Sequence, residues 1–176
     1  MSSIFNQVLI LFSTLFNVNS EIVADRSELL LDLQNQTATI TYYDLETSEN
    51  VEKLFIQEDL KRIKQATKFT SSYEFLSLSN VAVEAKKNSV DITITFTFDK
   101  FSDVGKFINL KLVDGKIIFP QMEMEKVTSS NGKKMKLEEL DIIAWDATTK
   151  IFELAIKRDK NIDRYQNFET IAPYFE

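Results

Sequence analysis

The stretch VDITITFTF, residues 90–98, indicates the fold most directly. Apolar residues occupy every second position, and polar residues occupy the positions between them. Successive side chains of a β-strand point to opposite faces, so we expect one face of this segment to be buried and the other to be wet. Such a division is typical of antiparallel sheets. The buried row is Val90, Ile92, Ile94, Phe96 and Phe98, and the wet row is Asp91, Thr93, Thr95 and Thr97.

Similar segments, separated by short polar breaks, run through much of the chain. Asp114-Gly115 is a dipeptide that type I′ hairpin turns favour. Pro120 marks a strand end or an edge, because it cannot donate a ladder hydrogen bond. The pattern therefore predicts a succession of hairpins. The predicted strands are 29–33, 37–43, 73–85, 90–98, 108–112, 116–119, 122–125, 137–145 and 150–156, and the main turns are 34–36, 86–89, 129–132 and 146–149.

Two segments show a helical period instead. Ile56, Leu60, Ile63 and Thr67 are separated by four, three and four residues, which predicts a helix within residues 48–68. Near the end of the chain, a second apolar series predicts a short C-terminal helix that stops near Pro173. That series is Ile162, Tyr165 and Phe168.

Together these patterns predict an α+β fold. We expect a mostly antiparallel β-meander of about eight strands, forming a curled sheet or partial barrel, with one central and one C-terminal helix. Strands and helices do not alternate, so a parallel doubly wound sheet is not expected. The expected division of the chain is residues 1–20, a signal peptide or N-terminal hydrophobic helix, and residues 21–176, a single α+β domain.

The first twenty residues contain an apolar block from residue 4 to residue 18. Its length and the small residue Ser20 after it fit a secretory signal peptide cleaved before Glu21. A helix docked on the domain and a membrane anchor are the alternatives. We therefore expect a secreted or periplasmic protein, with membrane association as the alternative and membrane contact only through residues 4–18.

The residue types that the chain lacks exclude several kinds of chemistry. It has 176 residues, no cysteine, no histidine and a formal net charge of −6. Disulfides, thiolate nucleophiles and Ser-His-Asp catalysis are therefore excluded within the chain. Its three glycines are scattered, so no phosphate-binding loop is expected. The acidic total argues against nucleic acid as a partner. We expect no cofactor.

Carboxylate chemistry remains open, because glycoside hydrolysis needs only two acids flanking the bond. Glu123 and Glu125 share a strand face, although acids on strand surfaces are usually solvated. The chain has a single tryptophan, Trp145, which argues against a cleft in which aromatic rings stack on sugars. We assign no catalytic residue. The other clustered acids are Glu138, Glu139, Asp141, Asp99 and Asp103.

The segment Asp159-Lys160-Asn161-Ile162-Asp163 matches the first ligands of a calcium loop. Arg164 replaces the glycine of that loop, and Thr170 stands where a bidentate glutamate is needed. A helix start explains the acids better, so we assign no metal ligand.

Rows of lysine and threonine have structural explanations. The lysines are expected to solubilise the protein or to protect a sheet edge, and binding of an anionic partner is the alternative. The threonines suit the wet face of a sheet, although regular threonine rows also occur on ice-binding faces. Asn35-Gln36-Thr37 is a glycosylation sequon at a predicted turn. The rows are Lys133, Lys134 and Lys136; Lys157, Arg158 and Lys160; Thr37, Thr39 and Thr41; and Thr93, Thr95 and Thr97.

The aromatic content suggests a function. The chain has 14 phenylalanines and 5 tyrosines, and Phe96, Phe98 and Phe152 are expected on inward faces. A curled sheet with an aromatic interior can enclose an apolar ligand. We therefore expect a non-catalytic, exported binding protein that takes an apolar small ligand or a protein partner through its sheet. The alternatives are an enzyme that uses acidic residues, similar in chemistry to a glycosidase, and a membrane-anchored accessory protein.

Overall fold

The computed structural model describes residues 22–49, 51–65, 76–121, 125–159 and 167–174. In these ranges the chain forms two antiparallel sheets, two α-helices and one 3₁₀ turn. The elements are β1 (Ile22–Asp32), β2 (Thr37–Ser48), α2 (Lys53–Gln65), β3 (Leu76–Ala85), β4 (Val90–Phe98), α4 (Phe101–Phe107), β5 (Lys111–Val113), β6 (Lys116–Pro120), β7 (Glu125–Ser130), β8 (Lys133–Leu137), β9 (Leu140–Asp146), β10 (Ile151–Arg158), β11 (Phe168–Thr170) and η1 (Ala172–Tyr174).

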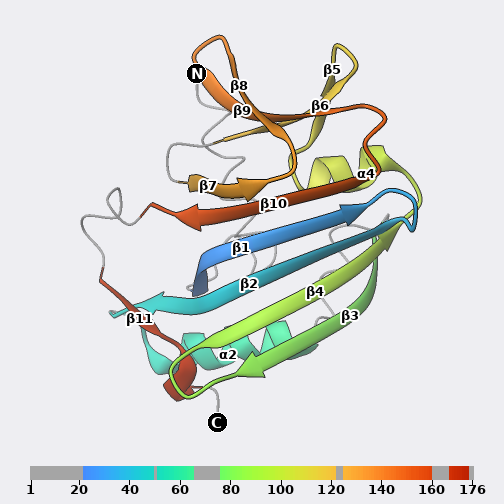
Figure 1. Ribbon diagram of the computed structural model, residues 1–176. Helices are drawn as coiled ribbons and strands as arrows, with labels where there is room; N and C mark the ends of the chain where they lie inside the picture. Colours follow the sequence, from blue (N-terminus) through green and yellow to red (C-terminus); the bar gives the residue numbers. More distant parts are fainter. Residues whose placement is uncertain (1–21, 50, 66–75, 122–124, 160–166, 175–176) are drawn as a thin grey trace.

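Sheet A is the larger of the two sheets. Its strands lie in the order β3-β4-β2-β1-β10-β7, and β11 also pairs with β2. Sheet B has the order β5-β6-β9-β8. Figure 1 shows sheet A as a curved layer with sheet B above it. The prediction of a mostly antiparallel α+β fold is confirmed, and within the described residues sheet A keeps two free edges rather than closing.

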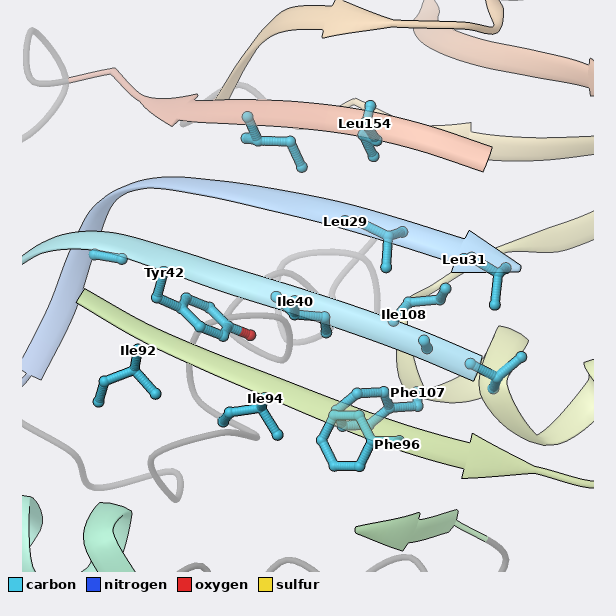
Figure 2. Packing of buried hydrophobic residues seen from close by; sticks show 14 of the residues in the cluster. Leu29, Leu31, Ile40, Tyr42, Ile92, Ile94, Phe96, Phe107, Ile108 and Leu154 are labelled. Carbon is cyan, nitrogen blue, oxygen red and sulfur yellow. The ribbon is translucent and has the colours of Figure 1, made fainter. Parts of the chain in front are cut away.

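The core lies against the inner face of sheet A. Figure 2 shows Ile40 and Tyr42 of β2 beside Ile94 and Phe96 of β4 among the buried side chains. Both helices contribute to the same cluster, and the ring of Phe107 from α4 meets that of Phe96 edge to face at 5.2 Å. Burial of each large apolar side chain contributes about 1.5–3 kcal/mol. The helix residues in the cluster are Ile56 and Leu60 of α2 and Val104 and Phe107 of α4.

Strand β4 has the bounds that its alternation predicts, and all five residues of its apolar row are buried. Asp91, expected on the wet face, is buried instead. Its Oδ1 accepts a hydrogen bond from the backbone N–H of Asp44 at 2.9 Å, and its Oδ2 lies 2.5 Å from Lys86 Nζ. Asp44 has a φ of 52°, so the β2 backbone departs from extended geometry there and its amide needs a partner outside the ladder.

Two predicted local features differ in the structure. The turn after β9 is present, because Thr149 N–H bonds Asp146 O at 2.9 Å, but β9 and β10 pair in different sheets and do not form the expected hairpin. Phe168, expected in a C-terminal helix, lies in β11, while Pro173 belongs to the 3₁₀ turn η1. Ile162 and Tyr165 lie outside the described residues.

The remaining differences concern the ends of elements. Helix α2 forms within the predicted segment 48–68, and the short helix α4 was not predicted. Residues 73–75 and 122–124 of two predicted strands lie outside the described residues, as do residues 1–20. The helices that the structure does describe include none with the length and apolar character needed to cross a membrane.

Candidate functional site

The candidate site is built around Glu125, the first residue of β7, and Tyr42 of β2. Glu125 pairs with Arg158 of β10, two residues from the buried pair Val127–Ile156. Because strand side chains alternate, Glu125 shares the inward face of Val127. Its side chain is directed toward the inner face of sheet A, and only 4% of the residue is exposed.

Tyr42 lies on the same inward face of sheet A, three strands away from β7. It is fully buried, and Figure 2 shows its hydroxyl among apolar side chains of β2 and β4. In the ladder it stands opposite Ser27 of β1, which stands opposite Ile156 of β10. Strands β1 and β10 therefore separate the backbones of Tyr42 and Glu125, whose side chains lie on the same face of the sheet.

Burial governs the charge of both groups. Removal from water raises the pKa of Glu125 from 4.5 to about 7. Burial also raises the pKa of Tyr42 well above its ordinary value, and the negative charge of Glu125 adds to that rise. At neutral pH, Glu125 is therefore divided between its protonated and ionised forms, while Tyr42 stays protonated.

The carboxyl of Glu125 is incompletely satisfied. Among the described residues, its buried Oε1 has no hydrogen-bond partner. Buried polar atoms are nearly always paired, because an unpaired one has lost its water without a replacement. In its protonated form the carboxyl can donate a hydrogen bond, and in its ionised form it can accept several. The site thus offers a polar group inside an apolar interior.

Cations near this end of the sheet are engaged with other acids. Arg158 forms an ion pair with Glu46, and its guanidinium lies 4.0 Å from the ring centre of Phe168. Lys126 Nζ lies 2.7 Å from Asp159 Oδ2. No cation contributes to the shifted pKa of Glu125, which burial alone explains.

The acids named from the sequence have different environments. Glu138, Glu139, Asp141 and Asp99 are exposed, and Asp103 is half-buried. Glu125 is the one of this set that the structure buries, so the interpretation as a solvated strand acid is wrong for it. Glu123 lies outside the described residues. The sequence contained no sign of this burial beyond the alternation of residues 122–125.

The calcium-like segment falls mostly on residues 160–166, outside the described ranges. Asp159 is ion-paired with Lys126, and Thr170 lies in β11 opposite Glu46 of β2. Across the part of the chain that is described, no three acidic side chains are grouped so as to hold a metal ion.

The lysine rows occupy two different places. Lys133, Lys134 and Lys136 lie on β8, an edge strand of sheet B. Lys157 lies on β10, an internal strand of sheet A, and its Nζ is 3.7 Å from Asp25 Oδ2. Lys160 lies outside the described residues.

The two threonine rows, distant in sequence, lie side by side on neighbouring strands. Thr37, Thr39 and Thr41 of β2 stand opposite Thr97, Thr95 and Thr93 of β4. Two of these pairs place their hydroxyl oxygens 3.2 Å apart. Sequence reasoning missed this pairing, because alternation does not say which strands become neighbours. These hydroxyls bond each other on a curved sheet, unlike the flat array of an ice-binding face (Figure 1).

The aromatic residues expected inside are inside. Phe96, Phe98 and Phe152 are buried in the main cluster. Trp145 is buried too, with its ring 5.3 Å from that of Phe152 and its Nε1–H bonded to Asn131 Oδ1 at 2.6 Å. Asn35 of the sequon is exposed at the β1–β2 turn. Comparison of the chain with protein-family models, with curated proteins and with solved structures finds no match.

Proposed function

We propose that this protein binds a small, largely apolar ligand inside the curve of sheet A, and that Glu125 and Tyr42 contact the ligand's polar group. It acts by binding rather than by catalysis. The observation that carries the proposal is the buried Oε1 of Glu125, which has no hydrogen-bond partner among the described residues. A ligand group that bonds this oxygen would recover the free energy of hydrogen bonding that burial removed.

The surroundings define the class of ligand. Val127 and Ile156, the buried pair next to Glu125, are apolar, so they favour an apolar skeleton. The carboxyl of Glu125 is the polar focus in this apolar setting, so we expect a single amine, hydroxyl or carbonyl group on that skeleton. A polyhydroxylated ligand is disfavoured, because most of its groups would be buried without partners.

Entry of a ligand requires local opening, since both polar residues are buried. The end of β7 is the expected place, because β7 is an edge strand of sheet A and Glu125 is its first residue. Edge strands have fewer neighbours than central strands, and regions with few contacts open at the lowest free energy.

Export is the second part of this proposal. It rests on the apolar block at residues 4–18 and on Ser20. N-terminal sequencing of protein expressed in a secretion-competent host tests it. A mature chain that begins at Glu21 supports export, whereas Met1 retained in the membrane fraction supports the anchored alternative.

Ligand binding is tested with apolar compounds of one skeleton that differ only in the head group: amine, alcohol, ketone, carboxylate and unsubstituted hydrocarbon. Thermal shift and native mass spectrometry measure binding to the wild type and to Glu125→Gln, Tyr42→Phe and Glu153→Gln. Glu153 is the matched control, because it is an exposed acid on β10. We expect Glu125→Gln to weaken binding of the best compound at least tenfold, since hydrogen bonds to charged groups contribute about 1.5–3 kcal/mol.

We expect Tyr42→Phe to weaken binding less, and Glu153→Gln to leave it unchanged. The ligand-binding proposal is wrong if no compound binds, or if Glu125→Gln and Glu153→Gln behave alike.

An acid–base enzyme is the second candidate, favoured by the pKa of Glu125 near 7, a value suited to proton transfer at neutral pH. The same experiment separates the two functions. A bound compound recovered with unchanged mass supports binding. A change of mass that occurs with the wild type and not with Glu125→Gln supports catalysis.

A further inference from the structure

Apart from the short strand β11, which pairs with β2 alone, the sheets have four edge strands within the described residues, and three of these four are blunted. Strand β5 has only three residues, and β8 carries three lysines. On β7, side chains bond backbone carbonyls: Lys134 Nζ lies 3.2 Å from Val127 O, and Gln121 Nε2 lies 3.2 Å from Glu125 O. Short strands and lysines are ordinary protection against pairing with another chain, and bonded carbonyls are unavailable to one.

The fourth edge, β3, lacks this protection. It spans ten residues, LSLSNVAVEA, with no lysine, arginine or proline. Figure 1 shows it as the outermost strand of sheet A. Its ladder is irregular between Leu78 and Asn80, so residues 80–85 form the regular part. Alternate residues of an edge strand direct their N–H and C=O groups away from the sheet, and no described side chain bonds the backbone of residues 80–85.

The side chains of this regular part complement those of a second copy. Val81 and Val83 are half-buried and pack against the core, whereas Asn80, Ala82 and Glu84 are exposed. If two such strands run antiparallel with Ala82 on a twofold axis, Val81 of each copy stands opposite Val83 of the other. Asn80 then stands opposite Glu84, and the two Ala82 residues face each other. Apolar groups meet apolar groups, and an amide meets a carboxylate.

We propose that the protein forms a twofold-symmetric dimer in which two β3 strands pair antiparallel about Ala82 and join two copies of sheet A into one continuous sheet. A second copy of the chain is a better partner for this edge than an unrelated peptide, because in this register no charged side chain faces another of the same sign. Twofold dimers with one self-complementary patch are also the commonest oligomers. This inference is independent of the ligand site, since Glu125 lies at the opposite edge of sheet A.

Analytical ultracentrifugation of the full chain over a range of concentrations tests the dimer. Ala82→Lys places two lysines side by side on the axis, and like charges directly opposite each other disfavour pairing. Because Ala82 is exposed, the monomer should fold normally, which circular dichroism checks. Thr148→Lys adds the same charge at an exposed turn after β9 and is the matched control. We expect Ala82→Lys to be monomeric and Thr148→Lys to dimerise as the wild type does.

Two further variants test the register. Asn80→Asp faces the carboxylate of Glu84 in the second copy and should weaken the dimer about tenfold, since the pair occurs twice. Asn80→Lys creates two ion pairs and should strengthen the dimer, with the gain lost at high salt. A wild type that stays monomeric at all concentrations overturns the proposal and leaves the edge to an extended segment of another protein. A dimer that Ala82→Lys does not disturb also overturns it, because its interface then lies elsewhere.

Discussion

Glu125 links the proposed function to a measurable property of the folded protein, because burial raises the pKa of its carboxyl from 4.5 to about 7. Between these two values the folded state binds more protons than the unfolded state, so the free energy of unfolding falls as the pH rises. Below about pH 4.5 the contribution is fully present, and above about pH 7 it has been lost. The difference of pKa corresponds to about 3 kcal/mol.

We therefore predict that Glu125→Gln is more stable than the wild type at pH 8, by up to about 3 kcal/mol, and that this advantage disappears near pH 4.5. Urea denaturation of both proteins at intervals between pH 4.5 and 8 measures the difference, in which the other titrating groups cancel. Glu153→Gln, at an exposed position, should follow the wild type throughout. A constant difference between Glu125→Gln and the wild type across this range would contradict a shifted carboxyl.

A second buried carboxylate, Asp91, has a structural role. It bonds the amide of Asp44, where β2 departs from extended geometry, and it pairs with Lys86 at the end of β3. We predict that Asp91→Ala lowers the free energy of unfolding by about 2–4 kcal/mol, because it leaves the amide without its partner. Asp91→Asn keeps an acceptor and should be milder. Glu139→Ala is the control, because Glu139 is an exposed acid in the turn between β8 and β9, and it should change stability by less than about 0.5 kcal/mol. Equal losses for Asp91→Ala and Asp91→Asn would show that the ion pair, not the amide bond, matters.

At the scale of elements, the segment between β7 and β8 joins the two sheets. Asn131 accepts hydrogen bonds from Trp145 Nε1 of β9 at 2.6 Å and from Glu153 N of β10 at 3.0 Å, so it bridges strands of different sheets. The next residue, Gly132, has no room for a side chain, because an added Cβ would lie 2.6 Å from both Ile143 Cγ2 and Trp145 Cε2. In the connection between β7 and β8, the backbone at Gly132 therefore packs directly against Trp145.

We predict that Gly132→Ala destabilises the protein by about 1–3 kcal/mol through overpacking against Trp145. Gly115→Ala at the β5–β6 turn is the comparison. Gly115 has a φ of 73° and open space around it. Gly115→Ala should therefore lower the free energy of unfolding by about 1 kcal/mol, entirely through backbone strain. Only Gly132→Ala should also change the tryptophan fluorescence of the native state. A larger loss of stability for Gly115→Ala than for Gly132→Ala would mean that the structure around Gly132 shifts to accommodate the added methyl group, which would contradict overpacking against Trp145.

The sequence predicted local structure much better than it predicted which strands pair with each other. Alternation gave β4 its bounds, and Asp114-Gly115 forms its turn with both φ angles positive, at 48° and 73°. Alternation reports which face is wet, yet it carries no information on which strands pair. For that reason the division of β9 and β10 between two sheets, the paired threonine rows and the burial of Glu125 appeared only in the structure. Each depends on contacts between residues distant in the chain.

At the scale of the whole molecule, the facing sides of sheets A and B share one hydrophobic cluster, and a small second cluster of Ile118, Ile142 and Ala144 belongs to sheet B alone. Ile117, Phe119, Ile143 and Trp145 of sheet B belong to the same cluster as Phe152 of sheet A. A shared core couples the stability of the two layers, because exposing one inner face exposes the other. We therefore expect the described elements to unfold together.

The single tryptophan makes this expectation testable, because Trp145 lies in sheet B with its ring 5.3 Å from that of Phe152 in sheet A. We predict that tryptophan fluorescence, which reports the junction of the sheets, and far-ultraviolet circular dichroism, which reports all strands, give coincident urea transitions. Phe152→Leu should lower both midpoints equally, since it leaves a cavity that both layers line. A fluorescence transition that precedes the loss of strand signal would show that sheet B detaches first, and the shared cluster would then not couple the two sheets.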